Sequence, residues 1–467
     1  MMIKKTITTT AILAVLLSSV VGQKQANRHA FSISQAVEYA YKNNVQVKSA
    51  LLNIQSQIQT NREVSAAALP NITGGIGAQF LPNIAVTVIP DFISPATYGV
   101  LIKEGVKDGN GNAIQMPSSF GSVNAQFGTK YNSNATISLR QILFDGQVFV
   151  GLQARNTAID FQTKNAEVTE ELIKSNIYKV YYQLVVSKTQ LNLLDANIDR
   201  IKKLEADATI LFKNGFAERI DIDKASVQLN NLHTEKLKAL NSINMGYLGL
   251  KTLMGMPIAD TLILTDTLTY AQLKQDVTSD PYAYEDRKDY QYLSLAKKLN
   301  EYNIRRFQLS YLPTVALGAS YTKQALRNSF DFFGPGPWFT ASAIGMNISI
   351  PIFDGFTKDA QIKKARIDLQ NTQNQMEALK INIDNAAEQA RLKYKNAIAT
   401  LEFQKKNMDL AEKVYTQTKK KYESGTGSNT EINASDVDLK AAQTNFISAL
   451  YDAVIAKIDY LTAVGKL

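Results

Sequence analysis

The chain has 467 residues, of which 45% are hydrophobic, and its 51 basic and 42 acidic side chains give a formal net charge of +9. This hydrophobic content excludes a wholly disordered chain, and the length is enough for a large buried core. Because there is no cysteine and there are only two histidines, the sequence excludes disulfide scaffolds and zinc–thiolate or iron–sulfur centres, and we expect neither a metal nor a cofactor.

Residues 1–22 have the pattern of a secretory signal peptide. Lys4 and Lys5 precede an apolar run, and Gly22 is a small residue ahead of a plausible cleavage point. A signal anchor that stays attached is the alternative, although the run is short for a membrane span. No later stretch has 18 consecutive apolar residues, so we expect any contact of the exported chain with a membrane to use strands.

Three short motifs occur twice in the same order, which predicts a duplicated unit. The first repeat is predicted at 23–256, a joining segment at 257–289 and the second repeat at 290–467. Between its first two motifs the first repeat is longer, and a long loop is predicted there at about 82–130. The motif pairs are Leu69-Pro70-Asn71-Ile72 with Leu312-Pro313-Thr314-Val315, Ile142-Leu143-Phe144-Asp145-Gly146 with Pro351-Ile352-Phe353-Asp354-Gly355, and Phe212-Lys213-Asn214-Gly215 with Tyr422-Glu423-Ser424-Gly425.

Each repeat contains two segments in which apolar and polar residues alternate. In the first repeat they follow Pro70 and precede Asp145, and in the second they lie at about 314–323 and 338–353. Four amphipathic strands of about ten residues are predicted, a length that matches tilted strands crossing a bilayer. A small soluble sheet remains the alternative.

A seven-residue apolar period follows each strand pair, over 147–213 and 356–422. It predicts two helices of roughly 100 Å each, reversing at tips near Gly215 and Gly425 into return helices. The strand–helix turns Asp145-Gly146 and Asp354-Gly355 fit turn geometry rather than a paired-carboxylate enzyme, so no enzyme is expected. Basic and acidic side chains alternate along these helices, which indicates a solvated face and no nucleic-acid partner.

Four strands are too few to close a barrel, and membrane strands do not leave their edges unpaired. The chain is therefore predicted to assemble with copies of itself. Two copies supply eight strands and a filled interior, whereas three supply twelve and a channel. Strand number alone does not choose between them, but the polar alternate faces favour a wet lumen.

The duplicated order of strands, Phe-Asp-Gly, long helix and Tyr-x-x-Gly resembles the TolC family of outer-membrane efflux proteins, also called outer membrane factors. The resemblance implies an α+β, mainly α, fold and a homotrimer. Its twelve-stranded β-barrel, four strands per protomer, would lie in outer-membrane lipid, and a long α-helical barrel would extend into the periplasm. The segment 257–289 would contribute to an equatorial belt.

The function implied by this resemblance is an exit duct of a tripartite efflux or type I secretion system. It would be a passive conduit docked to a periplasmic adaptor (membrane fusion) protein and an inner-membrane pump of the RND or ABC type. The alternative is an exported coiled-coil scaffold or adhesin without a channel. The cargo (drug, metal or protein), the particular partners and the resting open or closed state stay undecided by the sequence.

The resemblance also assigns roles to the two tips. It implies adaptor contact at Asn214, Gly215, Phe216, Ser424, Gly425 and Thr426. The alternative is that these residues only cap helices.

The family's periplasmic gate has an acidic pair six and nine residues after the second tip glycine. Here Glu431 occupies the first place and Ala434 the second, while Asp221 follows Gly215 by six residues and Lys224 by nine. Glu431 and Asp221 are the predicted gate acids, with Tyr422 matching the family's tip tyrosine. The alternatives are acids that favour a helix N-terminus and a tyrosine that packs in the core. Whether a carboxylate gate survives these departures stays open.

Overall fold

A computed structural model describes residues 27–268, 273 and 281–467; the predicted signal peptide, 1–22, lies outside the described residues. The chain forms two compact units, each built from pieces of both sequence repeats. The strand unit comprises Thr60–Arg155 and Tyr302–Ala365. The helical unit comprises the rest of the described chain, and the long helices contribute to both.

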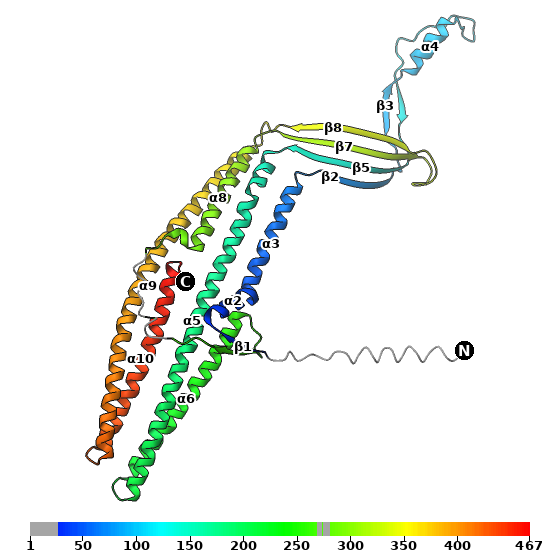
Figure 1. The fold of residues 1–467 in the computed structure, drawn as a ribbon. Coiled ribbons are helices and arrows are strands. Elements are labelled where there is room, and N and C mark those ends of the chain that lie inside the picture. The colour runs from blue at the N-terminus through cyan, green and yellow to red at the C-terminus, as the bar shows by residue number, and fades with distance from the viewer. Residues whose placement is uncertain (1–26, 269–272, 274–280) are drawn as a thin grey trace, which may run out of the picture. The chain divides into compact units, whose positions relative to one another are not determined.

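The strand unit contains one antiparallel sheet of four strands in the order β2-β5-β7-β8 (Figure 1). Its central pair joins the two repeats, and the edge strands are β2 and β8. The strands are β2 (Asn71–Phe80), β5 (Tyr131–Phe144), β7 (Thr314–Arg327) and β8 (Phe339–Ser349). β8 ends before the predicted 353 because Pro351 has no N–H for a ladder hydrogen bond, and β7 runs beyond the predicted 323.

The register sorts the side chains of this sheet onto two faces. We call them the apolar face and the polar face. The apolar face carries Ile72, Ile76, Phe80, Ile137, Leu139, Val315, Leu317, Tyr321, Ile344, Met346 and Ile348. The polar face carries Asn71, Thr73, Gln79, Asn132, Asn134, Thr136, Ser138, Arg140, Ser320, Thr322, Gln324, Asn347 and Ser349. Two side chains of the polar face, Thr136 and Thr322, hydrogen-bond across β5 and β7 at 3.0 Å.

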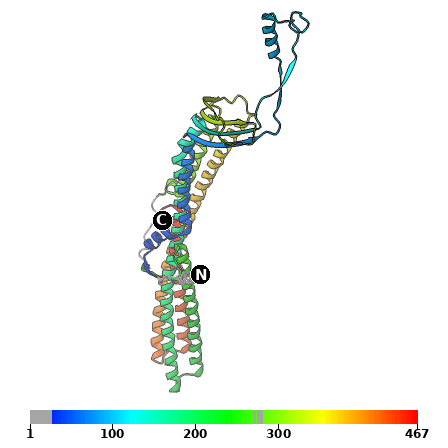
Figure 2. The ribbon, with the colours of Figure 1, turned by 90° about the vertical axis from the view of Figure 1, so that its right-hand side faces the viewer.

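The predicted long loop at about 82–130 is wrong in part, because it contains regular structure (Figure 2). β3 (Val86–Pro90) and β4 (Ser122–Gln126) form an antiparallel ribbon, and α4 (Ile93–Lys103) follows β3. Asp91 starts this helix by accepting the N–H groups of Ile93 and Ser94 at 3.1 and 2.9 Å. These elements are short and flanked by glycine, asparagine and proline, so the turn-rich composition concealed them.

The helical unit is organised around two helical hairpins (Figure 1). Side chains from all four of their helices form one core: Leu194, Ile198, Ile201, Leu204, Leu232, Tyr415, Ile432 and Leu439. The first hairpin is α5 (Gly146–Lys213) with α6 (Arg219–Met254), and the second is α9 (Thr357–Glu423) with α10 (Asn429–Ala463). The seven-residue apolar period thus corresponds to a packing seam between helices.

Shorter elements complete the two units. β1 (Arg28–Phe31) pairs in parallel with β6 (Thr261–Leu264), which belongs to the joining segment. Parts of that segment, 269–272 and 274–280, lie outside the described residues. The remaining elements among the described residues are α2 (Ile33–Asn43), α3 (Val45–Ala66), the 3-10 turn η1 (Tyr284–Asp286) and α8 (Lys288–Leu309).

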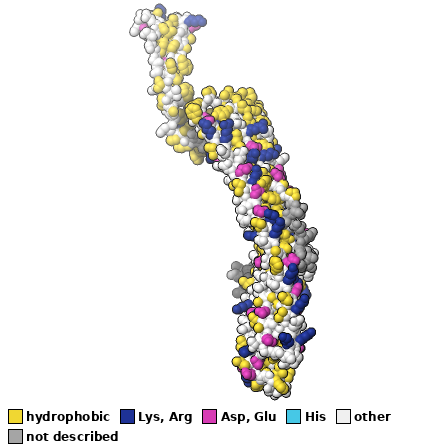
Figure 3. Space-filling view, turned by 90° about the vertical axis from the view of Figure 1, so that its left-hand side faces the viewer, with side chains coloured by type: hydrophobic (Ala, Val, Ile, Leu, Met, Phe, Trp, Pro, Cys, Tyr) yellow, Lys and Arg dark blue, Asp and Glu magenta, His cyan; other side chains and the backbone are white. Residues whose placement is uncertain are grey.

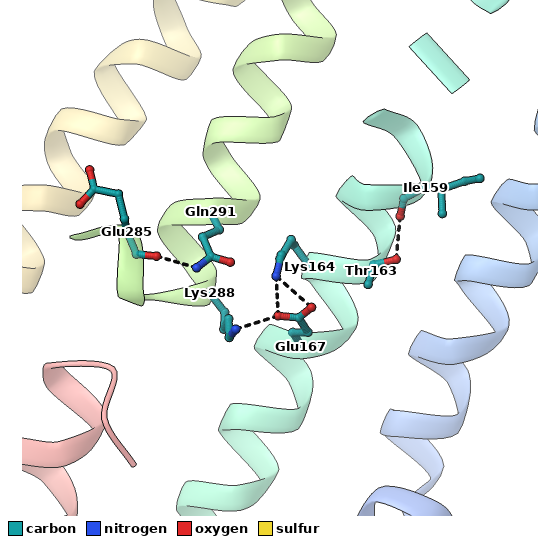
Figure 4. Close-up of polar contacts among 7 residues, drawn as sticks. All are labelled: Ile159, Thr163, Lys164, Glu167, Glu285, Lys288 and Gln291. Atoms are coloured by element: carbon teal, nitrogen blue, oxygen red, sulfur yellow. Dashed lines mark hydrogen bonds and ion pairs between the residues drawn. The ribbon is translucent and has the colours of Figure 1, made fainter. Parts of the chain in front are cut away.

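An ion-pair cluster fastens the start of α8 to α5 (Figure 4). The Glu167 carboxylate lies 2.7 Å from Lys164 Nζ and 3.0 Å from Lys288 Nζ. Nearby, the Phe161 and Tyr292 rings stack with centroids 4.4 Å apart. The three charges are partly buried, so their mutual attraction is screened less than on an open surface.

Hydrophobic side chains gather over the strands and the β3–β4 ribbon on the face drawn in Figure 3, whereas basic and acidic side chains are interspersed along the helices. Ile76 and Ile344 of the apolar face are 79% and 82% exposed. Soluble monomers rarely expose so much contiguous apolar surface. None of the described helices combines the length and apolarity required to cross a membrane.

Candidate functional site

The two hairpins end in turns of the same construction. Gly215 joins α5 to α6 and Gly425 joins α9 to α10, with φ angles of 78° and 72°. Glycine adopts this left-handed conformation without the steric cost of a Cβ. Each glycine N–H donates to the carbonyl three residues earlier, of Phe212 and Tyr422, at 3.0 Å. The chain therefore reverses direction at both glycines.

The six turn residues predicted to contact an adaptor are all exposed. A Cβ built on either Gly215 or Gly425 meets no atom within 4 Å. The chemistry of the two turns differs, because Phe216 is 82% exposed whereas the second turn presents hydroxyls. Those of Ser424 and Thr426 donate to the Lys421 carbonyl at 2.9 and 3.2 Å. The first turn thus offers an aromatic ring and the second a hydrogen-bonded polar cap.

A groove of about 750 Å³ lies between the two turns. The ends of α5 and α9 and the starts of α6 and α10 form its walls. Its lining includes Asp207, Phe216, Asp221, Tyr422, Ser428 and Asn429. The groove therefore combines acidic and aromatic groups from both repeats.

Asp221 connects the two hairpins within this groove. Its carboxylate accepts the N–H of Glu218 at 3.3 Å, capping α6, and also accepts a hydrogen bond from the Asn429 side chain. Asn429 in turn accepts from Asn433 at 2.8 Å. Both the capping role and a role between hairpins therefore apply to Asp221.

Tyr422 lies partly buried in the same groove. Burial raises the pKa of its hydroxyl, and the negative charges of Asp221 and Asp207 raise this pKa further. The hydroxyl therefore stays protonated at neutral pH and able to donate a hydrogen bond. Tyr422 also packs against the core shared by the four helices, so both of its predicted roles are compatible with its position.

Glu431 is placed differently from Asp221. It is exposed, it is absent from the groove lining, and its N–H donates to Ser428 Oγ at 3.2 Å at the start of α10. The single chain therefore brings Asp221 and Tyr422 together but not Glu431. Ala434 and Lys224, the two departures from the family's acidic pattern, are exposed on the same helices.

A buried ion pair joins the two hairpins, and neither of its residues was predicted as a site residue from the sequence. Arg200 Nε on α5 lies 3.1 Å from Asp436 Oδ1 on α10, with side chains 16% and 3% exposed. Gln228 donates to the other oxygen of Asp436, and the Arg200 guanidinium lies 4.8 Å from the Tyr415 ring centroid. Burial raises the pKa of the Asp436 carboxyl, although the Arg200 charge opposes this. The sequence carries no signal for the pair, because the apolar seam of α5 continues through Ile198 and Ile201 on either side of Arg200.

The two strand–helix turns hold their helices by side-chain caps. Asp145 Oδ1 accepts the N–H of Gln147 at 2.8 Å, and Asp354 Oδ2 accepts that of Lys358 at 3.1 Å. Gly146 and Gly355 stand directly after these acids. Within the described residues, no group of three or more His, Cys, Asp or Glu side chains is arranged to hold a metal ion.

The comparisons with known proteins agree with this architecture. The sequence profile of the family described as outer membrane efflux protein matches residues 283–466. The chain is 23% identical to the outer membrane efflux protein BepC of Brucella suis over 363 residues. This match covers 75% of the chain and 77% of BepC. The chain is similar to the TolC-like outer membrane efflux proteins, through its residues 283–466 and through these relatives. The outer membrane protein TolC of Escherichia coli is 20% identical over 355 residues, 72% of this chain and 70% of TolC.

Solved structures extend this likeness to nearly the whole length of the chain. VceC of Vibrio cholerae, an outer membrane protein, superposes with a TM-score of 0.67 at 15% identity, over 93% of this chain and 96% of VceC. CusC superposes with a TM-score of 0.72 at 14% identity, over 93% and 92%. The comparisons thus support an efflux protein of the outer membrane that extends into the periplasm and is not an enzyme.

Proposed function

We propose that the protein acts as a homotrimeric exit duct of the outer membrane. Three sheets, paired edge to edge between β8 of one copy and β2 of the next, would form a twelve-stranded barrel in outer-membrane lipid. The six hairpins would form the periplasmic α-helical barrel below it. Twelve strands enclose a lumen wide enough for passive passage, whereas eight are filled by their own side chains.

The observation that carries this proposal is the exposure of both sheet edges. Every residue of β8 is exposed, and nine of the ten residues of β2 are exposed. Unpaired edges beside an apolar face promote aggregation in water and are excluded from lipid unless the sheet closes. Edge pairing between copies satisfies both requirements.

Engineered cysteines test the edge pairing, since the chain has none of its own. Single cysteines scanned along β2 around Ile76 are combined with single cysteines along β8 around Ile344. At matching positions we expect oxidation of the detergent-extracted protein to give covalent dimers and trimers. Ile137→Cys, on the interior strand β5 of the same face, is the matched control and stays monomeric when paired with the same β8 cysteines. Covalent products that stop at the dimer, or no product in the whole scan, would contradict the trimer.

We also propose that the two tips dock onto a periplasmic adaptor, a membrane fusion protein, that couples the duct to an inner-membrane pump of the RND or ABC type. Support comes from the exposed turns and the groove between them. Phe216→Ala is expected to reduce export in cells while the amount of trimer in the outer membrane stays constant. Phe403→Ala is the control, because it removes an exposed aromatic ring of α9 that lies outside the tips. Undiminished export with Phe216→Ala would contradict docking through this ring.

The gate is proposed to close at the same groove. The link from Asp221 to Asn429 ties the hairpins of one protomer, and a threefold axis would bring together three copies each of Asp221, Glu431 and Tyr422. Clustered carboxylates attract cations and repel one another. The similarity to outer membrane efflux proteins favours the duct over the alternative of an exported scaffold or adhesin without a channel.

A further inference from the structure

The four strands of the sheet contain few charged side chains, and all of them are basic. β2, β5, β7 and β8, which the structure describes throughout, contain Arg140, Lys323 and Arg327 but no aspartate or glutamate. A charge in a membrane-spanning strand is costly on the lipid face and inexpensive on a water-filled face. The face on which each charge lies therefore decides its role.

Only Arg140 lies on the polar face. In the register it stands directly between Asn71 of β2 and Gly318 of β7. Lys323 and Arg327 lie on the apolar face, where Arg327 is buried and pairs with Asp331 at 2.5 Å. Arg140 is thus the one charge of these strands that would face the lumen of the proposed barrel.

The space around Arg140 is open. Its row across the sheet continues from Gly318 to Gly345. A Cβ built on Gly345 meets nothing within 4 Å, and one built on Gly318 meets only the Gly345 carbonyl oxygen at 3.9 Å. Arg140 is exposed, and no hydrogen bond or ion pair among the described residues engages its side chain. The guanidinium is therefore available to a solute.

The aspartates that follow the two strand pairs, Asp145 five residues after Arg140 and Asp354 after β8, have other partners. Asp145 accepts two N–H groups at the start of α5, and Asp354 accepts the Lys358 N–H and lies 3.8 Å from its Nζ. These carboxylates are engaged in capping helices. They leave the charge of Arg140 unneutralised on its face of the sheet.

We propose that Arg140 is a specificity-determining residue that forms a basic ring in the lumen at the helical end of the barrel and binds passing anions. This rests on the trimeric barrel of the proposed function. Three guanidiniums on one level concentrate anions, and the fork of donors on each matches carboxylate and phosphate oxygens. The duct would thus favour solutes that carry carboxylate or phosphate groups at this level, opposite in sign to the carboxylates of the tips.

The test is sided block of the full-length protein in planar lipid bilayers, with inorganic tripolyphosphate as the probe. Added to the strand side, tripolyphosphate is expected to reduce the wild-type current, and Arg140→Gln to weaken this block by about tenfold or more, as expected when a charge-assisted contact is removed. Arg140→Lys retains most of the block. Lys323→Gln, which removes an exposed charge of the same sign from the apolar face, is the matched control and leaves block unchanged.

A variant that adds a charge keeps the proposal testable even if Arg140→Gln fails to insert into the bilayer. Asn71→Arg adds a guanidinium beside Arg140 on the same face and is expected to strengthen block in the wild type and to restore it to Arg140→Gln. Equal block of wild type, Arg140→Gln and Asn71→Arg channels would overturn the basic ring while leaving the duct intact. Absence of any channel current both from the wild-type protein and from Asp221→Ala, in which the proposed gate is weakened, would instead overturn the proposed duct, and the ring with it.

Discussion

The two repeats share their motifs but use them for different physical purposes. Gly146 follows the first strand pair, and a Cβ there would lie 2.7 Å from both Cβ and O of Leu309. Gly355 follows the second pair, where a Cβ meets open space but φ is +66°, and the next residue, Phe356, has φ +65°. The first glycine permits close packing, whereas the second permits a left-handed backbone. The same motif therefore requires glycine for a different physical reason in each repeat.

A second asymmetry lies in the hairpins. Aligning the tip glycines places Leu410 of the second repeat opposite Arg200, and Ser226 of the first opposite Asp436. Leu410 is exposed, so the duplicated positions do not form a second buried pair. The hairpins are thus joined by a charge pair that only one combination of the two repeats provides.

Breaking this pair is expected to have the largest effect on stability. Arg200→Met leaves the Asp436 carboxylate buried without its cation, and such a loss costs about 3–5 kcal/mol of unfolding free energy. The measurement is denaturant unfolding of the detergent-solubilised trimer. Leu410→Met, at the matching exposed position, is the control and stays within about 0.5 kcal/mol of wild type. Equal stability of Arg200→Met and wild type would show that the pair contributes nothing.

The two strand–helix glycines are expected to differ in the same measurement. Gly146→Ala forces a Cβ against Leu309, and overpacking of this kind costs about 1–3 kcal/mol. Gly355→Ala has space for its methyl group, so only the left-handed backbone conformation lowers the free energy of unfolding, by about 1 kcal/mol. If Gly355→Ala proved the more damaging, backbone conformation rather than packing would dominate at these turns.

The two predicted gate acids are also expected to differ. Asp221→Ala removes the hydrogen bond from Asn429 and the cap on Glu218, each worth about 1 kcal/mol, and is expected to raise single-channel conductance and weaken block by divalent cations. Glu431→Ala removes only an exposed charge, so its change in conductance is smaller. Unchanged conductance and unchanged divalent block in both variants would remove the carboxylate gate.

The smallest expected effect is on pH dependence. Because burial raises the pKa of folded Asp436, the folded state holds this proton more tightly than the unfolded chain. This contribution to stability is complete below the unfolded aspartate pKa of about 3.9, and it is lost as pH rises through the higher folded pKa. Asp436→Asn is expected to flatten this decline in unfolding free energy, and Ser226→Ala to leave it unchanged. An identical decline in Asp436→Asn and wild type would assign the titration to other carboxyls.

The sequence by itself determined the features that depend on local periodicity and turn chemistry. Alternation over about 314–323 and the heptads over 147–213 correspond to β7 and α5, because helix hydrogen bonds and strand pleating repeat along the chain. Asp145 and Gly215 were identifiable because capping and positive φ restrict residue type within a few positions. The sheet faces likewise follow from alternation, so the sequence indicates that Arg140 lies on the polar face. Only the structure shows that the space around it is open.

Only the tertiary structure decided which distant segments meet. The pairing of β5 with β7 joins the repeats, and neither strand's own pattern specifies that partner. The contacts of Asp221 with Asn429, Arg200 with Asp436, and Gly146 with Leu309 each join residues more than a hundred positions apart. Local patterns cannot encode such contacts, because they depend on the packing of whole helices and strands. The short elements inside 82–130 were missed for the related reason that a five-residue strand is stabilised mainly by its partner across the ribbon.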